Sequence, residues 1–493
     1  MAVPVTSHAL ADRIAAVFAL TPDSPMVEFD DEWMSRRRMR DAARRIASAP
    51  GTDGEVGILL RNRPEFVAAL LGVLSAGGTV VVINPVRGDD RTRSDIAALR
   101  LPLIIGGPDD LHALVEPAPD TAVLELRGLD SEPHLTPAAV DRAVPGRTGV
   151  AVRMLTSGTT GPPKRIDLTY DMLARSVLGP DPSRAPAPTR PRTGVAVVNA
   201  PLVHIGGVFR VLQCVTEARP FVLLPRFELE RWIAAVRAHR PRAVSLVPAA
   251  LRAVLHSDLA REDLASIEVV TSGTAPLSAD DADAFHDKFG IPVLTSYAAT
   301  EFGGGVAGWT LPEHRRYWQT KRGSVGRASG GARLRVVDED GAVLPADRPG
   351  LLEVKPGQLG PTSEWIRTTD LARIDEDGFV WILGRADQAI IRGGFKILPD
   401  DVRAALEQHP GVAGAAVTAA PHDRLGEVPA AVVELRDRER VNTDDLVEFL
   451  RTRLAPYEIP ARIVVVAELP RTPSGKADLG AVRALARESS RNT

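Results

Sequence analysis

Hydroxyl side chains, two glycines and a lysine are concentrated in residues 154–165, which read Met-Leu-Thr-Ser-Gly-Thr-Thr-Gly-Pro-Pro-Lys-Arg. The glycines allow the backbone to turn, and successive N–H groups in such a turn form a concavity that binds anions. Two prolines separate the last glycine from the lysine, so the stretch is not a Walker A motif. A phosphate-binding loop and a polar surface loop both fit this pattern. The candidate phosphate contacts are Thr156, Ser157, Gly158, Thr159, Thr160, Gly161 and Lys164.

A second polar group, residues 295–305, follows the apolar run 291–294 and reads Thr-Ser-Tyr-Ala-Ala-Thr-Glu-Phe-Gly-Gly-Gly. In open α/β sheets, ligands bind beyond the carboxyl ends of the strands. Glu301, beside Thr300, could therefore hold a magnesium ion and a phosphate oxygen. An ordinary turn with a surface glutamate would give the same pattern.

Two further motifs lie nearer the C-terminus. Asp370 could accept hydrogen bonds from both hydroxyls of a ribose, and Arg385 could donate to those hydroxyls or to phosphate. Lys476 follows a Pro-Ser-Gly turn and could carry a mobile positive charge. Turn caps, a surface ion pair and a solvated loop would explain these residues equally well when each is taken alone.

The alternation of apolar segments predicts the elements that position these residues. Residues 56–60 and 79–83 are predicted strands, with a helix over 66–74 between them. Strand–helix–strand units with apolar strands are typical of a parallel sheet covered on both faces. The pattern recurs to about residue 330, with a predicted helix over residues 229–239, and Pro-rich residues 179–192 interrupt it as an exposed loop.

Short strands with Asp-Glu-Asp-Gly turns, the first over residues 333–337, follow from about residue 324 and predict a small antiparallel or barrel-like piece. The tail then alternates helices and strands again, with a helix over residues 442–454 capped by Asn442 or Thr443 and a strand over residues 462–466. The predicted fold class is α/β: a large N-terminal domain of βαβ units with a small β-barrel-like part, and an α+β C-terminal domain. The predicted domains are residues 1–385 and 386–493.

Composition excludes several classes of function. The chain has 493 residues, 44% of them hydrophobic and 25% charged, as in ordinary globular proteins. A net charge of −3 gives no electrostatic case for a nucleic-acid partner. No apolar run approaches the ~20 residues of a membrane span. The N-terminus lacks the features of a signal peptide, and there is a single cysteine, Cys214, so we expect a cytoplasmic protein.

Taken together, the motifs resemble those of the adenylate-forming superfamily, which includes acyl-CoA synthetases, adenylation domains and luciferases. The resemblance covers about residues 8–485, and the loop at 156–164 matches the pattern Thr-Ser-Gly-Thr-Thr-Gly-x-Pro-Lys without departure. Ala298 departs from the usual glycine after the tyrosine, and we expect only a slight effect on the nucleotide pocket. The other matching motifs are residues 201–207, 272–276, 297–301, 369–371, 384–387, 393–397 and 473–476.

The resemblance implies an ATP-dependent acid–CoA ligase that uses ATP, Mg²⁺ and CoA. Such an enzyme joins a carboxylic acid to ATP as acyl-AMP, releasing pyrophosphate, and then transfers the acyl group to CoA, releasing AMP. Residues 156–164 would hold the β- and γ-phosphates. Thr300 would contact the α-phosphate, and Glu301 would ligate Mg²⁺. Lys476 would bridge the acid and the α-phosphate.

The resemblance also implies the remaining contacts. Tyr297 would stack on adenine, and Asp370, assisted by Arg385, would bind the ribose. The C-terminal domain would be mobile about a hinge at Asp387. The backbone of Thr274, Ala275 and Pro276 would follow the adenine edge, and the tunnel for the CoA arm would be lined by Gly393, Gly394, Phe395 and Lys396.

The same resemblance predicts an acyl pocket. No carboxylate stands where amino-acid-activating domains keep one, so we expect a simple aromatic, alicyclic or medium-chain acid. A stand-alone adenylation enzyme that serves a carrier protein or an amine is the alternative, and a non-catalytic ligand-binding or scaffold protein is a third. The oligomeric state stays open, a homodimer included. The pocket residues would be His204, Gly206, Gly207, Val208, Gly273, Thr274, Ala299, Gly303, Gly304 and Gly305.

Overall fold

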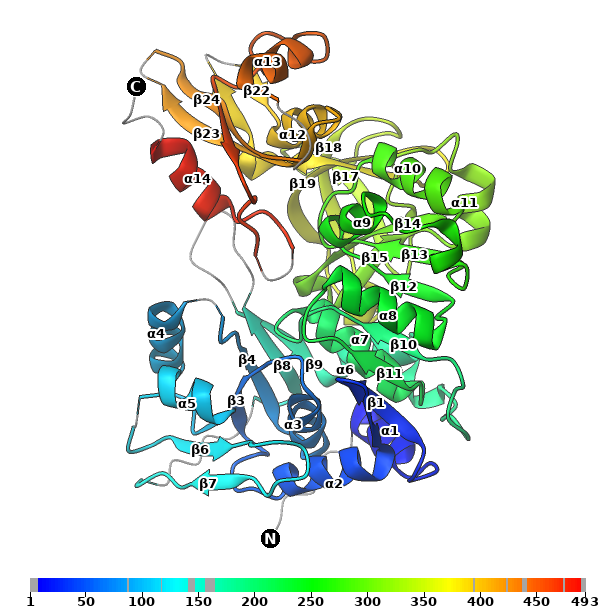
Figure 1. The fold of residues 1–493 in the computed structure, drawn as a ribbon, viewed down its shortest axis with the longest axis vertical. Coiled ribbons are helices and arrows are strands. Elements are labelled where there is room, and N and C mark those ends of the chain that lie inside the picture. Colours follow the sequence, from blue (N-terminus) through cyan, green and yellow to red (C-terminus); the bar gives the residue numbers. More distant parts are fainter. Residues whose placement is uncertain are drawn as a thin grey trace.

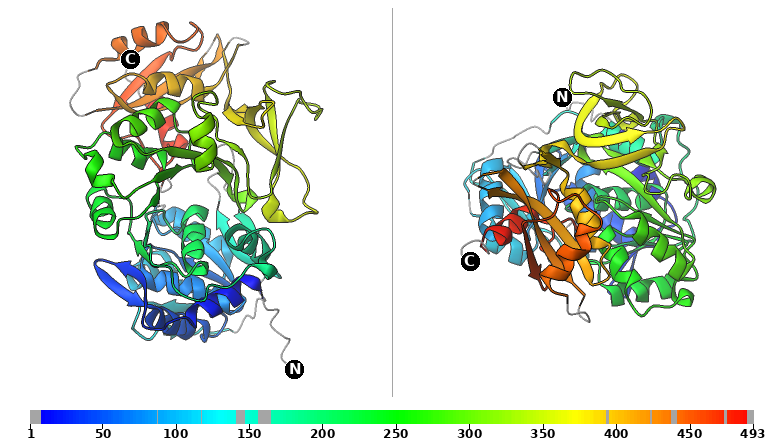
Figure 2. Two further views of the ribbon diagram at one scale, coloured as in Figure 1. Left: turned by 90° about the vertical axis from the view of Figure 1, so that its right-hand side faces the viewer. Right: turned by 90° about the horizontal axis from the view of Figure 1, so that it is seen from above.

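The computed structural model contains five β-sheets, four of which precede residue 386 (Figures 1 and 2). The model has the mixed α/β architecture predicted from the sequence. The structure describes residues 8–86, 88–116, 118–140, 147–155, 165–392, 395–422, 424–436, 441–472 and 475–488.

A seven-stranded sheet in the order β7-β6-β5-β3-β4-β8-β9 holds the first βαβ units. Its five central strands pair in parallel, and the two edge strands pair antiparallel. Helix α3 (Pro64–Ser75) connects the two central strands and begins with proline, which suits a first helical position. The predicted strand–helix–strand unit is thus confirmed. The strands are β3 (Glu55–Leu59), β4 (Thr79–Ile83), β5 (Leu103–Gly106), β6 (Ala122–Glu125), β7 (His134–Thr136), β8 (Val150–Leu155) and β9 (Arg165–Thr169).

The sequence pattern predicts one continuing series of strand–helix–strand units to about residue 330. In the structure, the strands of this part of the chain also form two further sheets. One has the order β10-β11-β1-β2, and the other has the order β12-β13-β14-β15-β16. Apolar segments predict strands but not the sheet to which each belongs, because that depends on contacts between distant segments. The strands are β1 (Pro25–Phe29), β2 (Glu32–Ser35), β10 (Ala196–Val198), β11 (Phe221–Leu223), β12 (Ala243–Ser245), β13 (Val269–Ser272), β14 (Val293–Ala299), β15 (Gly304–Gly308) and β16 (Arg327–Ala328).

The predicted barrel-like part is an antiparallel sheet in the order β17-β18-β19-β20. A bridge between Arg327 and Phe379 continues it toward β16, and Phe302 and Val306 share its apolar core. The strands therefore wrap around one core, as a barrel does. They are β17 (Arg333–Val337), β18 (Gly350–Lys355), β19 (Ile366–Ile374) and β20 (Val380–Arg385).

The C-terminal sheet has the order β22-β21-β24-β23, with β25 paired to β24. Its two apolar clusters use residues from Ile390 onward, whereas the four other clusters have no buried residue beyond Val380. Because apolar cores on the two sides of residue 386 are separate, we propose the domain boundary there. The strands are β21 (Ile390–Arg392), β22 (Phe395–Ile397), β23 (Val412–His422), β24 (Gly426–Leu435) and β25 (Arg462–Val466).

The helices pack against these sheets. Helix α8 has the predicted limits, and of the two predicted caps of α13, Asn442 is the one whose side chain accepts from the Asp445 N–H. Within the described ranges, no helix has both the length and the apolar character that a membrane span requires. The helices not yet given are α1 (Ala9–Phe18), α2 (Arg36–Ala47), α4 (Asp89–Leu99), α5 (Pro108–Leu114), α6 (Tyr170–Leu178), α7 (Ile205–Thr216), α8 (Leu229–His239), α9 (Pro248–Leu255), α10 (Ala279–Phe289), α11 (Leu311–Tyr317), α12 (Pro399–Glu407), α13 (Thr443–Arg451) and α14 (Leu479–Glu488).

Candidate active site

The pairing of β19 with β20 places Asp370 directly opposite Arg385. Arg385 Nη2 lies 2.6 Å from the Thr369 hydroxyl, and its guanidinium also donates to both Asp387 oxygens, at 2.9 and 2.7 Å. Asp370 and Arg385 are 15 positions apart in sequence, and only the strand register makes them neighbours. The predicted ribose-binding pair is therefore brought together in space.

Tyr297 reaches the same place from β14. Its hydroxyl donates a hydrogen bond to the Asp370 carboxylate. Burial raises the pKa of Asp370, whereas the hydrogen bond from Tyr297 and the nearby positive charge of Arg385 lower it. Burial, followed by the negative charge of Asp370, raises the pKa of Tyr297 well above its ordinary value. Near neutral pH the tyrosine is therefore a neutral donor to the carboxylate.

Thr300 and Glu301 lie directly after β14, in a single 3₁₀ turn (Thr300–Phe302) that ends at Gly303 in the left-handed conformation, with φ +72°. Their position at the end of a strand is the one predicted from the sequence. Glu301 is exposed, and its negative charge acts on Tyr297 and on Lys476.

Glu301 is chemically suited to the Mg²⁺-binding role that the sequence predicts for it. No group of three or more histidine, cysteine or acidic side chains that could enclose a metal occurs in the described part of the chain. Mg²⁺ usually binds through one or two carboxylates together with substrate phosphates and water, rather than in an all-protein cage. A single exposed carboxylate such as that of Glu301 is sufficient for such a site.

Lys476 comes from the C-terminal domain, on a hairpin closed by a bridge between Arg471 and Ala477. The Thr472 N–H donates to the Lys476 carbonyl at 2.7 Å. The hairpin lies against the start of α9: a Cβ at Gly475 would be 3.2 Å from Val247 Cγ2 and 4.0 Å from Ala249 Cβ. Lys476 is thus held against the N-terminal domain by the loop that carries it.

The charges around Lys476 come from the N-terminal domain. Its pKa is lowered, first because the walls of the site displace water and then because of the positive charge of Arg385, while Asp370 and Glu301 oppose the shift. Lys476 itself is exposed. Its charge interacts with those of Arg385, Asp370 and Glu301, so these four predicted residues lie close to one another.

His204 is the N-cap residue of α7. Burial, and then the positive charge of Lys476, lowers its pKa to about 4. Its Nε2 atom is buried and has no hydrogen-bond partner among the described residues. A neutral imidazole of this kind could hydrogen-bond a substrate carboxylate in the predicted acyl pocket.

The segment predicted to follow the adenine edge is strained. Thr274 has φ +69°, a left-handed conformation that is rare for a β-branched residue. A Cβ on the preceding Gly273 would be 2.8 Å from the Ser296 hydroxyl and 3.3 Å from its carbonyl oxygen, so any side chain there would require Ser296 to shift. Strained backbone is concentrated at functional sites because it is retained where it contributes to binding.

The predicted acyl-pocket residues have different surroundings. Among the described residues, a Cβ on Gly206 would meet no atom within 4 Å, and a Cβ on Gly305 would meet only the Tyr297 carbonyl oxygen, at 4.0 Å. A Cβ on Gly207 would be 2.2 Å from the Pro201 carbonyl oxygen, and Val208 is fully buried in the main core. Gly303 and Gly304 face the side chains of α6, and Ala299 ends β14. A larger side chain at Gly206 or Gly305 would therefore extend into free space.

Several predicted residues lie outside the described part of the chain. They are residues 156–164 of the phosphate loop together with Gly393 and Gly394, and the same holds for the side chain of Lys396. The flanks of the loop are described: Leu155 and Arg165 are paired across β8 and β9. Phe395 is 55% exposed and stacks on Tyr457, with ring centroids 4.4 Å apart.

The structure adds residues that the sequence analysis did not single out. The hydroxyl of Thr368 interacts with Tyr297 and accepts from the Asp370 N–H at 3.1 Å, so it helps to orient both groups. Arg252 joins α9 to the C-terminal domain. A single arginine in the apolar segment Pro248–Leu255 is the sequence signal that could have identified it.

Two family models match most of this chain. The family model described as AMP-binding enzyme matches residues 14–361, and the model described as AMP-binding enzyme C-terminal domain matches residues 401–476.

Individual proteins are similar over most of their length. A feruloyl-CoA synthase from Amycolatopsis sp is 30% identical, with 91% of this chain and 92% of the relative covered. The 4-coumarate–CoA ligase 1 of Oryza sativa subsp. japonica is 28% identical, with 89% of this chain and 84% of the relative covered. The solved structure of an ATP-bound RpMatB–BxBclM chimera superposes with a TM-score of 0.81 at 25% identity, with 97% of this chain and 99% of the chimera covered.

Proposed function

The chain belongs to the family of AMP-binding enzymes, as an AMP-forming acid–thiol ligase, and on that premise we propose that it activates an aromatic carboxylic acid with ATP and transfers the acyl group to CoA. The observation that carries the proposal is the meeting of Lys476 with Glu301, Asp370 and Arg385. These groups come from both domains, and together they can hold a nucleotide and an acid.

In the first half-reaction, a carboxylate oxygen attacks the α-phosphorus of ATP. The bond from that phosphorus to the bridging oxygen breaks, and pyrophosphate leaves. The reaction brings two anions together, so preorganised positive charge lowers the barrier. Lys476 would contact both reactants and hold them in line, and His204 would hydrogen-bond the carboxylate from its buried Nε2 atom.

The nucleotide would be held by its base, sugar and phosphates. Asp370 would accept from the ribose hydroxyls, and Tyr297 would stack on adenine. The loop at 156–164 would bind the β- and γ-phosphates, and Glu301 would hold Mg²⁺, which neutralises phosphate charge when bound.

In the second half-reaction, the CoA thiolate attacks the acyl carbonyl carbon, and the bond to the AMP oxygen breaks. The thiol proton passes to solvent, and AMP leaves. We place the thiol's approach along Gly393, Gly394, Phe395 and Lys396, after movement of the C-terminal domain about Asp387. Binding of the acyl group would involve the glycines at 206 and 303–305.

The relatives support an aromatic acid, because 4-coumarate and ferulate both carry a ring. Alicyclic and medium-chain acids are the next candidates. We also propose that the protein acts in the cytoplasm, and a homodimer is compatible with the proposal.

A panel of acids incubated with ATP, Mg²⁺ and CoA, with the thioesters identified by mass spectrometry, tests the function. We expect an aromatic acid to give the largest yield, with one AMP formed per thioester. AMP release that depends on a carrier protein or an amine instead of CoA would favour the stand-alone adenylation enzyme. Absence of pyrophosphate exchange with every acid would contradict the proposal.

A further inference from the structure

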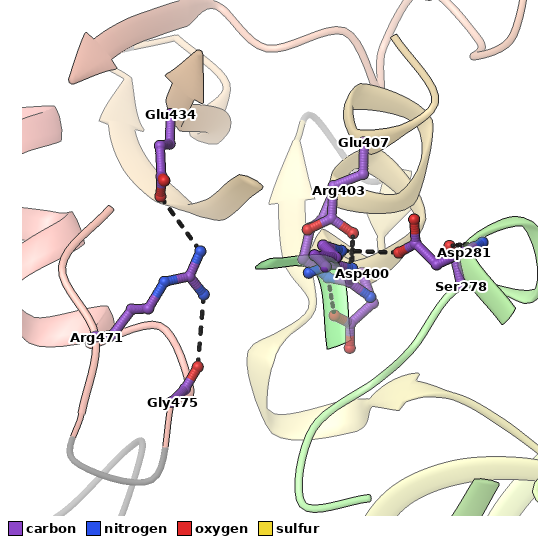
Figure 3. Close-up of polar contacts among 9 residues, drawn as sticks. Ser278, Asp281, Asp400, Arg403, Glu407, Glu434, Arg471 and Gly475 are labelled. Carbon is purple, nitrogen blue, oxygen red and sulfur yellow. Dashed lines mark hydrogen bonds and ion pairs between the residues drawn. The ribbon is translucent and has the colours of Figure 1, made fainter. Parts of the chain in front are cut away.

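An ion pair crosses from the C-terminal domain to the N-terminal domain. Arg252 Nη2 on α9 lies 3.0 Å from Glu407 Oε2 at the end of α12. Figure 3 labels Glu407 together with Arg403, Asp400 and Asp281. The Arg252 side chain is 11% exposed and that of Glu407 8%. A charged hydrogen bond that is largely shielded from water is stronger than one on the surface, so this contact can influence where the C-terminal domain sits.

Each partner also has a partner in its own domain. Arg252 Nε lies 2.7 Å from Asp281 Oδ2 on α10, and Glu407 Oε2 lies 2.6 Å from Arg403 Nη1 on α12. Arg403 is in turn 3.0 Å from Asp400. Removing one partner of a buried pair is costly because it leaves a charge unpaired. Here the interdomain contact can break without that cost, because both charges remain paired after the domains separate.

The same helix holds the hairpin that carries Lys476. Ala249 lies against Gly475, and Arg252 is three residues further along α9. Residues three apart lie on the same face of a helix. One face of α9 therefore contacts the C-terminal domain twice, once at the hairpin and once at α12.

We propose that Arg252 and Glu407 form a reversible latch that positions Lys476 in the adenylation site. Arg252 is a positioning residue, because it acts through Glu407 and the hairpin rather than on the reactants. The kinetic consequence of this inference rests on the proposed function: weakening the latch slows adenylation and leaves the rate of the thioester step unchanged. Its structural consequence, a shift of the C-terminal domain, does not depend on that function.

The kinetic test compares Glu407→Gln, Arg252→Gln and the double variant in two assays. We expect each single variant to lower pyrophosphate exchange about fivefold to tenfold, and thioester formation from a preformed acyl-adenylate to stay within about twofold. The double variant should be no worse than the poorer single one, because both changes remove the same contact. Asp281→Asn is the matched control, since it removes a charge beside Arg252 without touching the interdomain contact, and it should change exchange less than about twofold.

Equal losses in both half-reactions, or a double variant whose loss is the product of the single losses, would overturn the latch. If Glu407→Gln does not fold, Glu407→Asp keeps the charge with a shorter reach and is expected to lower exchange in the same direction.

A structural test remains informative even if no acid supports exchange. Fluorescent labels on Val343→Cys and Val465→Cys, which are exposed positions in the two domains, report domain position by energy transfer. Cys214 is buried, so labelling is directed to the introduced cysteines. We expect Glu407→Gln to shift the energy-transfer distribution away from that of the labelled parent. An unchanged distribution would overturn the latch, whereas a shift with no exchange in the parent would refute only the proposed function.

Discussion

The Tyr297 hydroxyl donates a hydrogen bond to the carboxylate of Asp370, and this contact joins β14 to β19 at the proposed ribose site. The tyrosine occupies one carboxylate oxygen and leaves the other available. It also opposes the effect of burial on Asp370, which would otherwise favour the protonated acid. The tyrosine therefore helps to keep a carboxylate ready to accept hydrogen bonds from the nucleotide.

Tyr297→Phe should weaken ATP binding more strongly at acidic pH. Removing the hydroxyl raises the pKa of Asp370 further, and only the ionised carboxylate accepts from both ribose hydroxyls. As the pH falls, the variant therefore loses ATP affinity at a higher pH than the parent protein does. We expect the KM for ATP to rise about twofold to tenfold, with the larger factor near pH 6 than near pH 8. A factor that does not vary with pH would contradict this role.

Lys476→Ala should separate the two half-reactions. Its ammonium group is expected to act on the attacking carboxylate and the α-phosphate, so pyrophosphate exchange should fall by about 10³-fold. Formation of thioester from a preformed acyl-adenylate should fall far less. Parallel measurement of both rates is the check, and equal losses would remove Lys476 from the adenylation step.

Asp387→Pro should keep adenylation and lose CoA transfer. Proline fixes φ and so prevents the backbone change that a hinge must absorb. Asp387 also accepts from Arg385, so Asp387→Asn is the control for the side chain. We expect Asp387→Asn to retain most of the thioester rate, and Asp387→Pro to lose about 10²-fold or more. Survival of both rates in the proline variant would place the hinge elsewhere.

Gly206 and Gly207 offer a matched pair of substitutions. Gly206→Ala adds a methyl group to open space, so the fold should be unaffected, and the relative kcat/KM for bulky and small acids should change. Gly207→Ala places the methyl group against the Pro201 backbone, so we expect a loss of about 1–3 kcal/mol in the free energy of unfolding. Thermal denaturation and an acid panel distinguish the two outcomes. Equal destabilisation by both would contradict the structure around α7.

His204→Gln should reduce the acid sensitivity of the fold. The pKa of His204 is lowered to about 4 in the folded protein, compared with an ordinary value near 6.5. The unfolded chain therefore binds more protons between these values, and this contribution to stability is lost as pH falls through that window. The Tm of the variant should fall less than that of the parent between about pH 7 and pH 5. Identical falls would show that His204 titrates normally.

Local pattern was sufficient to predict most of the elements. Helix α8, β17 and β25 have the predicted limits, because apolar spacing and flanking turns define them locally. Strand β14 is longer than predicted and includes Tyr297 and Ala299, since its polar residues pair with β15 rather than forming a loop. Its length depends on a partner strand, which local spacing cannot reveal.

The local sequence pattern also could not predict that the strands of the first 385 residues divide into four sheets. Strand β1 pairs with β11 in parallel, although almost two hundred residues separate them. Such pairing is decided by which buried faces fit together over the whole domain. The contact between Arg252 and Glu407 was missed for the same reason: the lone arginine in α9 is a local signal, but its pairing with a glutamate 155 positions away is not.

The sequence by itself determined the chemistry available to this protein. The types, order and spacing of the motifs around residues 156, 301, 370 and 476 resemble those of the adenylate-forming superfamily, and that resemblance implied a nucleotide, an acid and a thiol. Only the tertiary structure decided which groups act on one another. The register of β19 on β20 places Asp370 beside Arg385, and the docking of the C-terminal domain on α9 brings Lys476 to both. Electrostatic interactions depend on distance in space, and that distance is set by packing between segments far apart in the chain.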